Sequence, residues 1–333
     1  MDIKPLLSGI EQELQRQVAR LDSPRTQPFH EMLTYHMGWT GEGAGPEATG
    51  KRIRPLMLVL CTSGCGAEWQ SALPAAAAIE LVHNFSLVHD DIQDNSDRRR
   101  GRPTTWVKWG APMAINVGDA LFVMSNQAII DLKDSYPAET IVRAAEILHN
   151  TCLELTRGQF LDMSYEERTD LGVDDYWPMV AGKTAALLSS ACQIGALLGD
   201  ADEAKQDSYR SFGHYLGLAF QVQDDILGIW GNEAVTGKSA ASDLIEGKNS
   251  LPVLAGLSAN GKFAERWKQG PIRRDEVEEI ARLLVNEGGY GTAYEASKQM
   301  TDLALLNLYE ADPQGEAGEA LYQLADRLLK RKQ

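Results

Sequence analysis

The apolar residues of this 333-residue chain recur with the period of an α-helix. Near the N-terminus Ile10, Leu14 and Val18 follow one another at intervals of four residues, so all three lie on one helix face. The same pattern returns near the C-terminus at Leu303, Leu306, Tyr309, Ala320, Leu321, Leu324 and Leu328. Alternating strand-like runs bounded by turn pairs are scarce. The pattern predicts an all-α protein of about ten helices, with loops over 259–276 and 311–319.

The charge and the cysteines exclude several classes of function. With 47 Asp and Glu against 32 Lys and Arg, the chain carries a formal charge of −15. Nucleic-acid binding depends on cationic patches, and an acidic surface repels the phosphate backbone, so we exclude a nucleic-acid partner. The 4 cysteines form neither a CxxC pair nor a cluster with histidine. This argues against zinc and against a disulfide framework, and it fits a reducing cytoplasm.

No segment has the composition of a secretory signal or of a membrane span. The N-terminus carries Asp2 and lacks an apolar core flanked by small residues. The most apolar stretch, 185–199, contains Ser189, Ser190 and Gln193 and falls short of the ~20 apolar residues that a bilayer requires. Composition has no break along the chain, so we expect one domain over 1–333.

A first acidic cluster, DDIQD, follows the apolar run 81–88. Asp90 and Asp94 are four residues apart and share a helix face, while Asp91 lies ~100° round from Asp90. Carboxylates this close repel one another unless a cation lies between them. Oxygen ligands select hard ions, and Mg²⁺ commonly shares its coordination shell with substrate phosphates. A helix end carrying surface acids is the alternative, and this motif alone does not decide between the two.

A second acidic pair, Asp224 and Asp225, ends another apolar helical stretch. Carboxylates that project from facing helices are how helical bundles build metal sites, so the two clusters predict facing walls of one metal site. Chance recurrence is the alternative, because Asp174-Asp175 also occurs. That third pair follows Gly172 and is interpreted as a helix cap.

Basic residues are clustered close to the acidic ones. Residues 98–100 are all arginine and follow Asp94, and Lys51, Arg52 and Arg54 end a glycine-rich loop. Arginine matches phosphate oxygens bidentately, and lysine adds a compact charge. Each run in isolation is typical of a solvated surface. Together with the acidic clusters, they predict a site for a phosphorylated ligand with Mg²⁺ as the bridge.

In their order along the chain, these motifs resemble those of the trans-prenyltransferases, or polyprenyl diphosphate synthases. The matching segments are 50–55, Glu80 with His83, 90–94 with 99–101, 118–121, Gly158-Gln159 with Asp162, Lys183-Thr184, 220–225, 237–238, 242–244 and 247–248. The resemblance implies a single large helical bundle of the isoprenoid synthase type with a central cavity. It also implies a cytoplasmic homodimer that works in isoprenoid biosynthesis.

The resemblance further implies the reaction and the role of each residue. Isopentenyl diphosphate and an allylic diphosphate would condense head to tail by ionisation, alkene attack and proton loss, with several Mg²⁺ ions per active site. The implied metal ligands are Asp90, Asp94 and Asp224, supported by Asp91 and Asp225. The implied contacts of the allylic diphosphate are Arg99, Lys183, Thr184, Gln221, Lys238 and Lys248, and those of isopentenyl diphosphate are Lys51, Arg54, His83 and Arg100. The implied catalytic residues are Asp90, Asp94, Arg99, Lys183, Asp224 and Lys238.

The resemblance further implies that Phe85 and the small Ser86 beside it limit the length of the product chain. Phe85 precedes Asp90 by five residues and lies ~140° from it on a helical wheel, so spacing alone favours an ordinary core residue. In the family, a bulky residue at this position forms the floor of the cavity that receives the growing chain. Phe85 and a first motif without an insertion resemble geranylgeranyl (twenty-carbon) diphosphate synthases. A farnesyl or longer-chain product is the alternative, and Gly228 departs from the third aspartate of many second motifs.

Two further functions use the same fold. A terpene cyclase ionises one diphosphate and needs no pocket for a second substrate, so Lys51, Arg54, His83 and Arg100 argue against it. A non-catalytic subunit of a heteromeric synthase is expected to have lost acidic ligands, whereas both clusters are intact apart from position 228. The sequence therefore favours a chain-elongating prenyltransferase.

Overall fold

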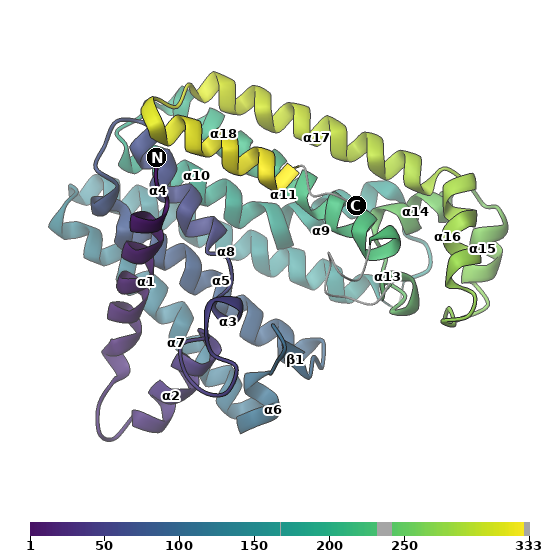
Figure 1. The fold of residues 1–333 in the computed structure, drawn as a ribbon, viewed down its shortest axis with the longest axis horizontal. Coiled ribbons are helices and arrows are strands. Elements are labelled where there is room, and N and C mark those ends of the chain that lie inside the picture. The colour runs from purple at the N-terminus through teal and green to yellow at the C-terminus, as the bar shows by residue number, and fades with distance from the viewer. Residues whose placement is uncertain (167, 232–241, 330–333) are drawn as a thin grey trace. The chain divides into compact units, whose positions relative to one another are not determined.

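The chain is almost wholly helical, and the prediction of an all-α fold is confirmed (Figure 1). The computed structural model describes residues 1–166, 168–231 and 242–329. Within these residues the strands are β1 (Arg98–Arg99) and β2 (Arg102–Pro103), which pair antiparallel. The helices are α1 (Lys4–Val18), η1 (Ala19–Leu21), α2 (Gln27–His36), α3 (Pro46–Thr49), α4 (Ile53–Gly64), η2 (Trp69–Ala72), α5 (Leu73–Gln93), α6 (Thr105–Trp109), α7 (Ala111–Ile130), η3 (Asp131–Asp134), α8 (Ala138–Tyr165), α9 (Val173–Val180), η4 (Ala181–Ala185), α10 (Ala186–Leu198), α11 (Glu203–Trp230), α13 (Ser242–Ile245), α14 (Leu251–Ser258), α15 (Lys262–Trp267), α16 (Val277–Asn286), α17 (Gly289–Ala311) and α18 (Gly315–Leu329).

The chain divides into two compact units, each described by itself. The first unit comprises Met1–His149, Ser190–Gln206 and Asp312–Leu321. In it α5 packs along α7, and α1 and α4 pack against α5 (Figure 1). α1 buries Ile10, Leu14 and Val18, so the helix face predicted from their spacing is confirmed. The second unit comprises Asn150–Ser189, Asp207–Ala311 and Tyr322–Gln333.

In the second unit α14 packs against α17 and α9. Its core includes Tyr176, Val222, Leu251 and Ala293, which come from four helices. α9 begins after Gly172, whose backbone N–H donates to the Asp175 carboxylate at 2.9 Å. The interpretation of Asp174-Asp175 as a helix cap is therefore confirmed.

Three details in the C-terminal part of the chain differ from the sequence-based expectation. The helix predicted around Leu306 and Tyr309 is present, but these two residues are 52% and 75% exposed, because α17 buries Ala304 and Leu308 on another face. The loop predicted over 259–276 contains α15. This short helix forms because Phe263 is fully buried and its backbone N–H donates to Glu287. The second predicted loop ends early, since α18 begins at Gly315.

Within the described residues two helical stretches are long and apolar enough to cross a membrane, judged by length and composition alone. They are Trp69–Gln93 and Ala111–Asp134, and 61% and 44% of their most apolar windows are buried in the protein. The sequence-based expectation rested on 185–199 and overlooked both. The buried Ala75–Ala78 segment of α5 gives the first stretch an ordinary reason for its apolarity, because small core residues let neighbouring helices pack closely.

Candidate active site

The acidic cluster of the first unit lies at the C-terminal end of α5. Asp90 and Asp91 lie in its last turn, and Asp94 is the C-cap residue. This end of a helix already carries partial negative charge, so three added carboxylates require nearby cations. Asp91 is 2% exposed, whereas Asp90 is partly exposed and Asp94 is exposed. The more open oxygens of Asp90 and Asp94 are therefore accessible to a hydrated ion.

A tight hairpin brings arginines to the acidic end of α5. Arg99 donates from Nε to Asp91 at 2.8 Å and forms an ion pair with it. Burial raises the pKa of Asp91 to about 6, although Arg99 favours its charged form. Arg100 and Gly101 both have positive φ, 50° and 75°, as a two-residue hairpin turn requires. The Arg100 side chain turns away to donate to the Ala48 carbonyl at 2.7 Å.

The motif Gly50–Pro55, which leads into α4 at Ile53, lies against this hairpin through Gly50. A Cβ atom on Gly50 would lie 2.7 Å from the Arg100 guanidinium carbon, so glycine makes room for that side chain. Arg52 has φ 49° and is buried, where it donates to Glu80 at 2.8 Å and to Glu11 at 3.0 Å. These two ion pairs hold the backbone that carries Lys51 and Arg54. Lys51 itself is exposed.

His83 lies on α5 beside the same cations. Its Nε2 atom is 3.4 Å from an Arg54 guanidinium nitrogen. Burial and the nearby Arg54, Arg100 and Arg99 hold the pKa of His83 well below its usual value, so the ring is neutral. A neutral imidazole accepts a hydrogen bond and adds no charge. The structure thus brings three of the predicted isopentenyl diphosphate contacts, Arg54, His83 and Arg100, close enough to act on one another electrostatically.

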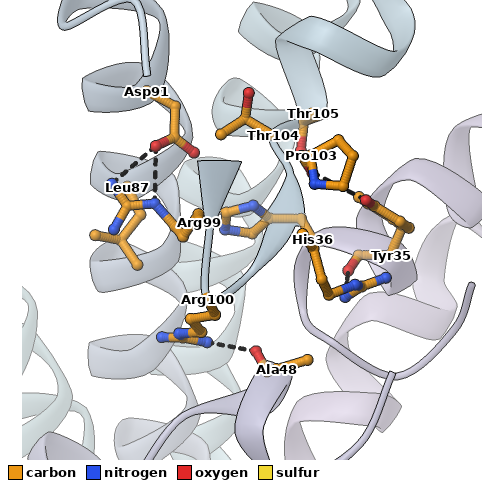
Figure 2. Close-up of a pocket in the computed structure, with 11 residues that line it drawn as sticks. Tyr35, His36, Ala48, Leu87, Asp91, Arg99, Arg100, Pro103, Thr104 and Thr105 are labelled. Carbon is orange, nitrogen blue, oxygen red and sulfur yellow. Dashed lines mark hydrogen bonds and ion pairs between the residues drawn. The ribbon is translucent and has the colours of Figure 1, made fainter. Parts of the chain in front are cut away.

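A small cavity lies between Asp91 and the hairpin (Figure 2). Its volume is about 20 Å³, room for about one water molecule. Figure 2 shows the Asp91–Arg99 ion pair and the Arg100–Ala48 hydrogen bond at its wall. The Nε2 atom of His36 and the Oγ1 atom of Thr105 line it without a hydrogen-bond partner among the described residues. Burial, with Arg99 and Arg100, lowers the pKa of His36 to about 3.

Phe85, the predicted floor residue, packs in an aromatic group. Its ring centroid is 5.1 Å from that of Phe122 on α7 and 5.0 Å from that of His89. A Cβ on Gly118 would lie 2.3 Å from His89 Nε2, which explains the glycine in that motif. Ser86 donates its hydroxyl to the His83 carbonyl at 2.8 Å. Sequence reasoning missed Phe122, which only the pairing of α5 with α7 identifies.

In the second unit the helix through Lys183 is locally widened. Residues Ala181–Ala185 form η4, a π-helical turn, and such turns often mark functional sites. A Cβ on Gly158 would lie 2.1 Å from the Lys183 nitrogen, and one on Gly182 would lie 2.5 Å from the Glu154 carbonyl oxygen. The glycines therefore let α8 and η4 approach backbone to backbone. The Lys183 ammonium forms an ion pair with Asp162.

The second acidic motif lies near the end of α11. Asp224 is partly exposed, and Asp225 is buried. Asp225 accepts hydrogen bonds from Tyr176, Gln221 and the Leu251 backbone N–H. Burial raises the pKa of Asp225 to about 6, while these donors oppose the rise. The Thr184 hydroxyl donates to Gln221 Oε1 at 2.9 Å, so two predicted substrate contacts touch one another.

Position 228 has no room for a side chain. A Cβ there would lie 2.2 Å from an oxygen of Asp243, so the carboxylate of a later residue occupies the space. Asp243 is buried, and Lys248 lies 3.7 Å from it and 2.8 Å from Glu246. Lys238, predicted to contact substrate, lies outside the described residues.

The donor set suits an ion that arrives with its ligand. Among the described residues no three His, Cys, Asp or Glu side chains converge on one point to form a complete metal cage. Mg²⁺ is usually bound by one or two carboxylates together with substrate phosphates, and Asp90 and Asp94 supply such oxygens. The prediction that the two acidic clusters face one another stays a prediction.

Sequence reasoning named the charged site residues but missed the groups that hold them. It grouped Arg52 with the cations expected to meet a phosphorylated ligand, whereas this buried side chain is paired with Glu80 and Glu11. It did not single out Glu11 or Tyr176. Glu11 is 41 residues from Arg52, and Tyr176 is 49 residues from Asp225. No local pattern signals either contact.

Residues 45–284 match the family model named polyprenyl synthetase. The chain belongs to this family. The resemblance inferred from the motifs is thereby confirmed, and the matched span contains both acidic clusters.

Similar proteins agree with this assignment. The geranylgeranyl diphosphate synthase of Mycobacterium tuberculosis (strain ATCC 25618 / H37Rv) is 39% identical over 292 residues, covering 86% of this chain and 83% of the relative. A (2E,6E)-farnesyl diphosphate synthase of Mycobacterium bovis is 39% identical over 280 residues, covering 84% and 72%. The crystal structure of a polyprenyl synthetase from Streptomyces coelicolor A3(2) is 36% identical, with a TM-score of 0.86 and 96% of each chain covered.

Proposed function

We propose that the protein is a Mg²⁺-dependent prenyltransferase that makes geranylgeranyl diphosphate. It condenses isopentenyl diphosphate with an allylic diphosphate. The bond between the allylic carbon and the diphosphate oxygen breaks, and the alkene of isopentenyl diphosphate attacks the resulting carbocation. A proton then leaves, with the departed diphosphate as its acceptor. Membership of the polyprenyl synthetase family and the names of the relatives support this reaction.

One observation carries the proposal: besides Arg99, which is paired with Asp91, the first unit holds further cations in the same neighbourhood. Arg99 is paired with Asp91 at the acidic end of α5. Arg54 lies beside His83, and Arg100 lies against Gly50, next to Lys51. A second cationic group suits the diphosphate of a second substrate, which a terpene cyclase does not use. The intact acidic clusters likewise argue against a non-catalytic subunit.

The proposed Mg²⁺ ligands are Asp90, Asp94 and Asp224, with Asp91 and Asp225 in support, and several ions bind per active site. Bound Mg²⁺ supplies positive charge that stabilises the leaving diphosphate. Asp91 holds Arg99, so this carboxylate orients a cation toward the same group.

The cationic side chains stabilise the leaving group as its charge develops. Fixed donors that are already oriented contribute without reorganising during the step. For the allylic diphosphate these are Arg99, Lys183, Lys238 and Lys248. Thr184 and Gln221 are two further proposed contacts of this substrate. The carbocation requires a pocket that excludes water, and no side chain acts as a nucleophile.

The aromatic group around Phe85 supports a twenty-carbon product. The Phe85 ring is braced by Phe122 and His89, so it is held in place rather than free to swing aside. The relatives include both geranylgeranyl and farnesyl synthases, so a fifteen-carbon product is the second candidate.

The direct test is product analysis. Purified protein is incubated with Mg²⁺, labelled isopentenyl diphosphate and farnesyl diphosphate, and the products are separated by chain length. A twenty-carbon product supports the proposal. Elongation of geranyl diphosphate that stops at fifteen carbons would instead identify a farnesyl synthase, and absence of any elongated product would overturn the prenyltransferase function.

We also propose that the protein works as a cytoplasmic homodimer. α7 exposes four apolar side chains, Met113, Ile115, Val123 and Ile130, each at least 44% exposed. An apolar helix face of this kind is typical of a protein interface. Contact with a second copy of the chain would bury these residues. It would explain why α7 is apolar without a membrane.

A further inference from the structure

The carboxylate of Asp225 is held by donors within its own unit. Oδ2 accepts from the Tyr176 hydroxyl at 2.7 Å and from the Leu251 backbone N–H at 3.1 Å. Oδ1 accepts from Gln221 Nε2 at 2.9 Å. An ionised carboxylate offers about four lone-pair positions, and these donors take three of them. Leu251 opens α14, so the carboxylate also lies at the positive end of a helix.

These contacts fix the direction of a hydrogen-bond chain. Gln221 Nε2 donates to Asp225 Oδ1, so the NH₂ group of this side chain points to Asp225. The amide oxygen of Gln221 is then left to accept, and the Thr184 hydroxyl donates to it at 2.9 Å. Thr184 has a single hydroxyl proton, and this bond uses it. The chain leaves one N–H of Gln221 and the oxygen lone pairs of Thr184 for a ligand.

We propose that Tyr176 and Asp225 are positioning residues, which lock Gln221 and Thr184 so that the allylic diphosphate meets the remaining N–H donor of Gln221. In this arrangement Asp225 is an anchor and not a Mg²⁺ ligand. A phosphate oxygen accepts from Gln221, while the Thr184 oxygen accepts from a donor such as metal-bound water. The inference rests on the proposed function, since it names what two substrate contacts present to that ligand.

Tyr176 is suited to a positioning role because it is too deeply buried to contact the substrate directly. It is 1% exposed, and its ring packs edge-on against Trp177 at 5.2 Å. Burial, followed by the charge of Asp225, holds the pKa of the Tyr176 hydroxyl well above its usual value, so it stays protonated and donates. Its effect on a ligand therefore passes through Asp225 and Gln221.

Ligand binding without turnover separates an anchor from a metal ligand. Binding of inorganic diphosphate is measured by calorimetry at increasing Mg²⁺ for wild type, Asp224→Asn, Asp225→Asn and Tyr176→Phe. We expect Asp224→Asn to raise the Mg²⁺ concentration for half-maximal binding by about tenfold or more. Asp225→Asn and Tyr176→Phe should leave that concentration within about twofold of wild type but weaken diphosphate binding at saturating Mg²⁺ by about tenfold. An increase for Asp225→Asn equal to that for Asp224→Asn would overturn the inference.

Steady-state kinetics with a matched control test the positioning role. Tyr136→Phe removes a tyrosine hydroxyl that is 2.6 Å from Ser71 in the first unit, outside the proposed site. We expect Tyr176→Phe to raise KM for the allylic diphosphate by about fivefold to tenfold and to leave KM for isopentenyl diphosphate unchanged. Equal kinetic effects of the two Tyr→Phe substitutions would overturn the inference.

The two tests keep the inference separate from the proposed function. If the Asp225→Asn variant does not fold, both experiments can be done with Tyr176→Phe alone, because this substitution removes only the hydroxyl group. A wild-type protein that binds diphosphate but makes no elongated product would overturn the proposed function, and the binding test would still decide the inference. A wild-type protein that binds no diphosphate would overturn both.

Discussion

Asp91 and Asp94 lie three residues apart in one motif but meet different environments. Asp91 is buried and paired with Arg99, while Asp94 is exposed at the negative end of α5. The first carboxylate orients a cation, and the second is accessible to an ion from solution. The sequence motif does not distinguish these tasks, because spacing defines the face of a residue but not what covers it.

Replacement of Asp94 by Asn should separate function from stability. We expect turnover to fall by about 100-fold or more, because a proposed Mg²⁺ ligand is lost. The metal-free protein should gain about 0.3–1 kcal/mol of unfolding free energy, since a negative charge leaves a helix C-terminus. Denaturant unfolding in a chelator measures this gain.

Phe85 and Phe122 should act together on product length. Phe85→Ala removes the proposed floor, so we expect products longer than twenty carbons by chromatography. Phe122→Ala removes the ring that braces Phe85 and should shift the distribution the same way, to a smaller extent. An unchanged distribution in both variants would show that other side chains limit the chain.

At the scale of elements, the sequence predicts where helices form better than it predicts which face of each helix is buried. The four-residue spacing in α1 identified its buried face. In α17 the large residues Leu306 and Tyr309 are exposed, because Ala304 and Ala311 allow close packing on another face. A prediction from periodicity relies on the positions of large apolar residues. Closely packed helices often place small residues in the contact instead, so the prediction selected the wrong face of α17.

The departure at position 228 has a structural cause that the sequence alone did not reveal. A methyl group at Gly228 in α11 would lie within van der Waals overlap of Asp243. We expect Gly228→Ala to lower the unfolding free energy by about 1–3 kcal/mol from overpacking, which exceeds the ~1 kcal/mol that alanine gains in helix propensity. Denaturant unfolding measures the change.

Gly291 provides the matched control for this substitution. It lies in α17, and no atom lies within 4 Å of a Cβ built there. Gly291→Ala should therefore stabilise the protein by up to ~1 kcal/mol through helix propensity. Stabilisation by both substitutions would contradict the explanation of Gly228.

At the scale of the whole molecule, two partly buried histidines, His36 and His83, should lower the stability of the protein in acid. Burial lowers the pKa of His36 to about 3, and the pKa of His83 is also well below its usual value. Below the ordinary histidine pKa of ~6.5 the unfolded chain binds protons that the folded protein does not. The contribution of the two neutral histidines to the free energy of unfolding is therefore complete above pH ~6.5. It is lost progressively as the pH falls from ~6.5 toward about 3.

Comparison of variants measures this loss. Each affected histidine costs at most about 1.4 kcal/mol per pH unit below 6.5, or about 2 kcal/mol at pH 5. We expect wild type to lose more unfolding free energy between pH 7 and pH 5 than His36→Gln does. His149→Gln, at an exposed position, serves as the control for the substitution itself. Identical slopes in all three proteins would contradict the prediction.

The exposed face of α7 should control assembly. Val123 is 55% exposed and lies among other apolar residues of that helix. Val123→Glu places a charge there, so we expect light scattering to detect monomers where wild type forms dimers. Tyr309→Glu changes a residue that is 75% exposed on α17 and should leave the dimer intact. A monomeric wild type would contradict the homodimer.

The π-helical turn Ala181–Ala185 lets the helix hold one additional residue at this point. A π turn contains one residue more than the α-helical turn it replaces. Deleting one residue within it would restore a regular α-helical turn, and the helices on either side would nearly keep their register because the bulge alone absorbs the extra residue. The bulge that brings the Lys183 backbone against Gly158 would be lost. A one-residue deletion here is therefore expected to preserve the fold and to alter the site, whereas the same deletion in a regular part of α9 would rotate the residues that follow by about 100°.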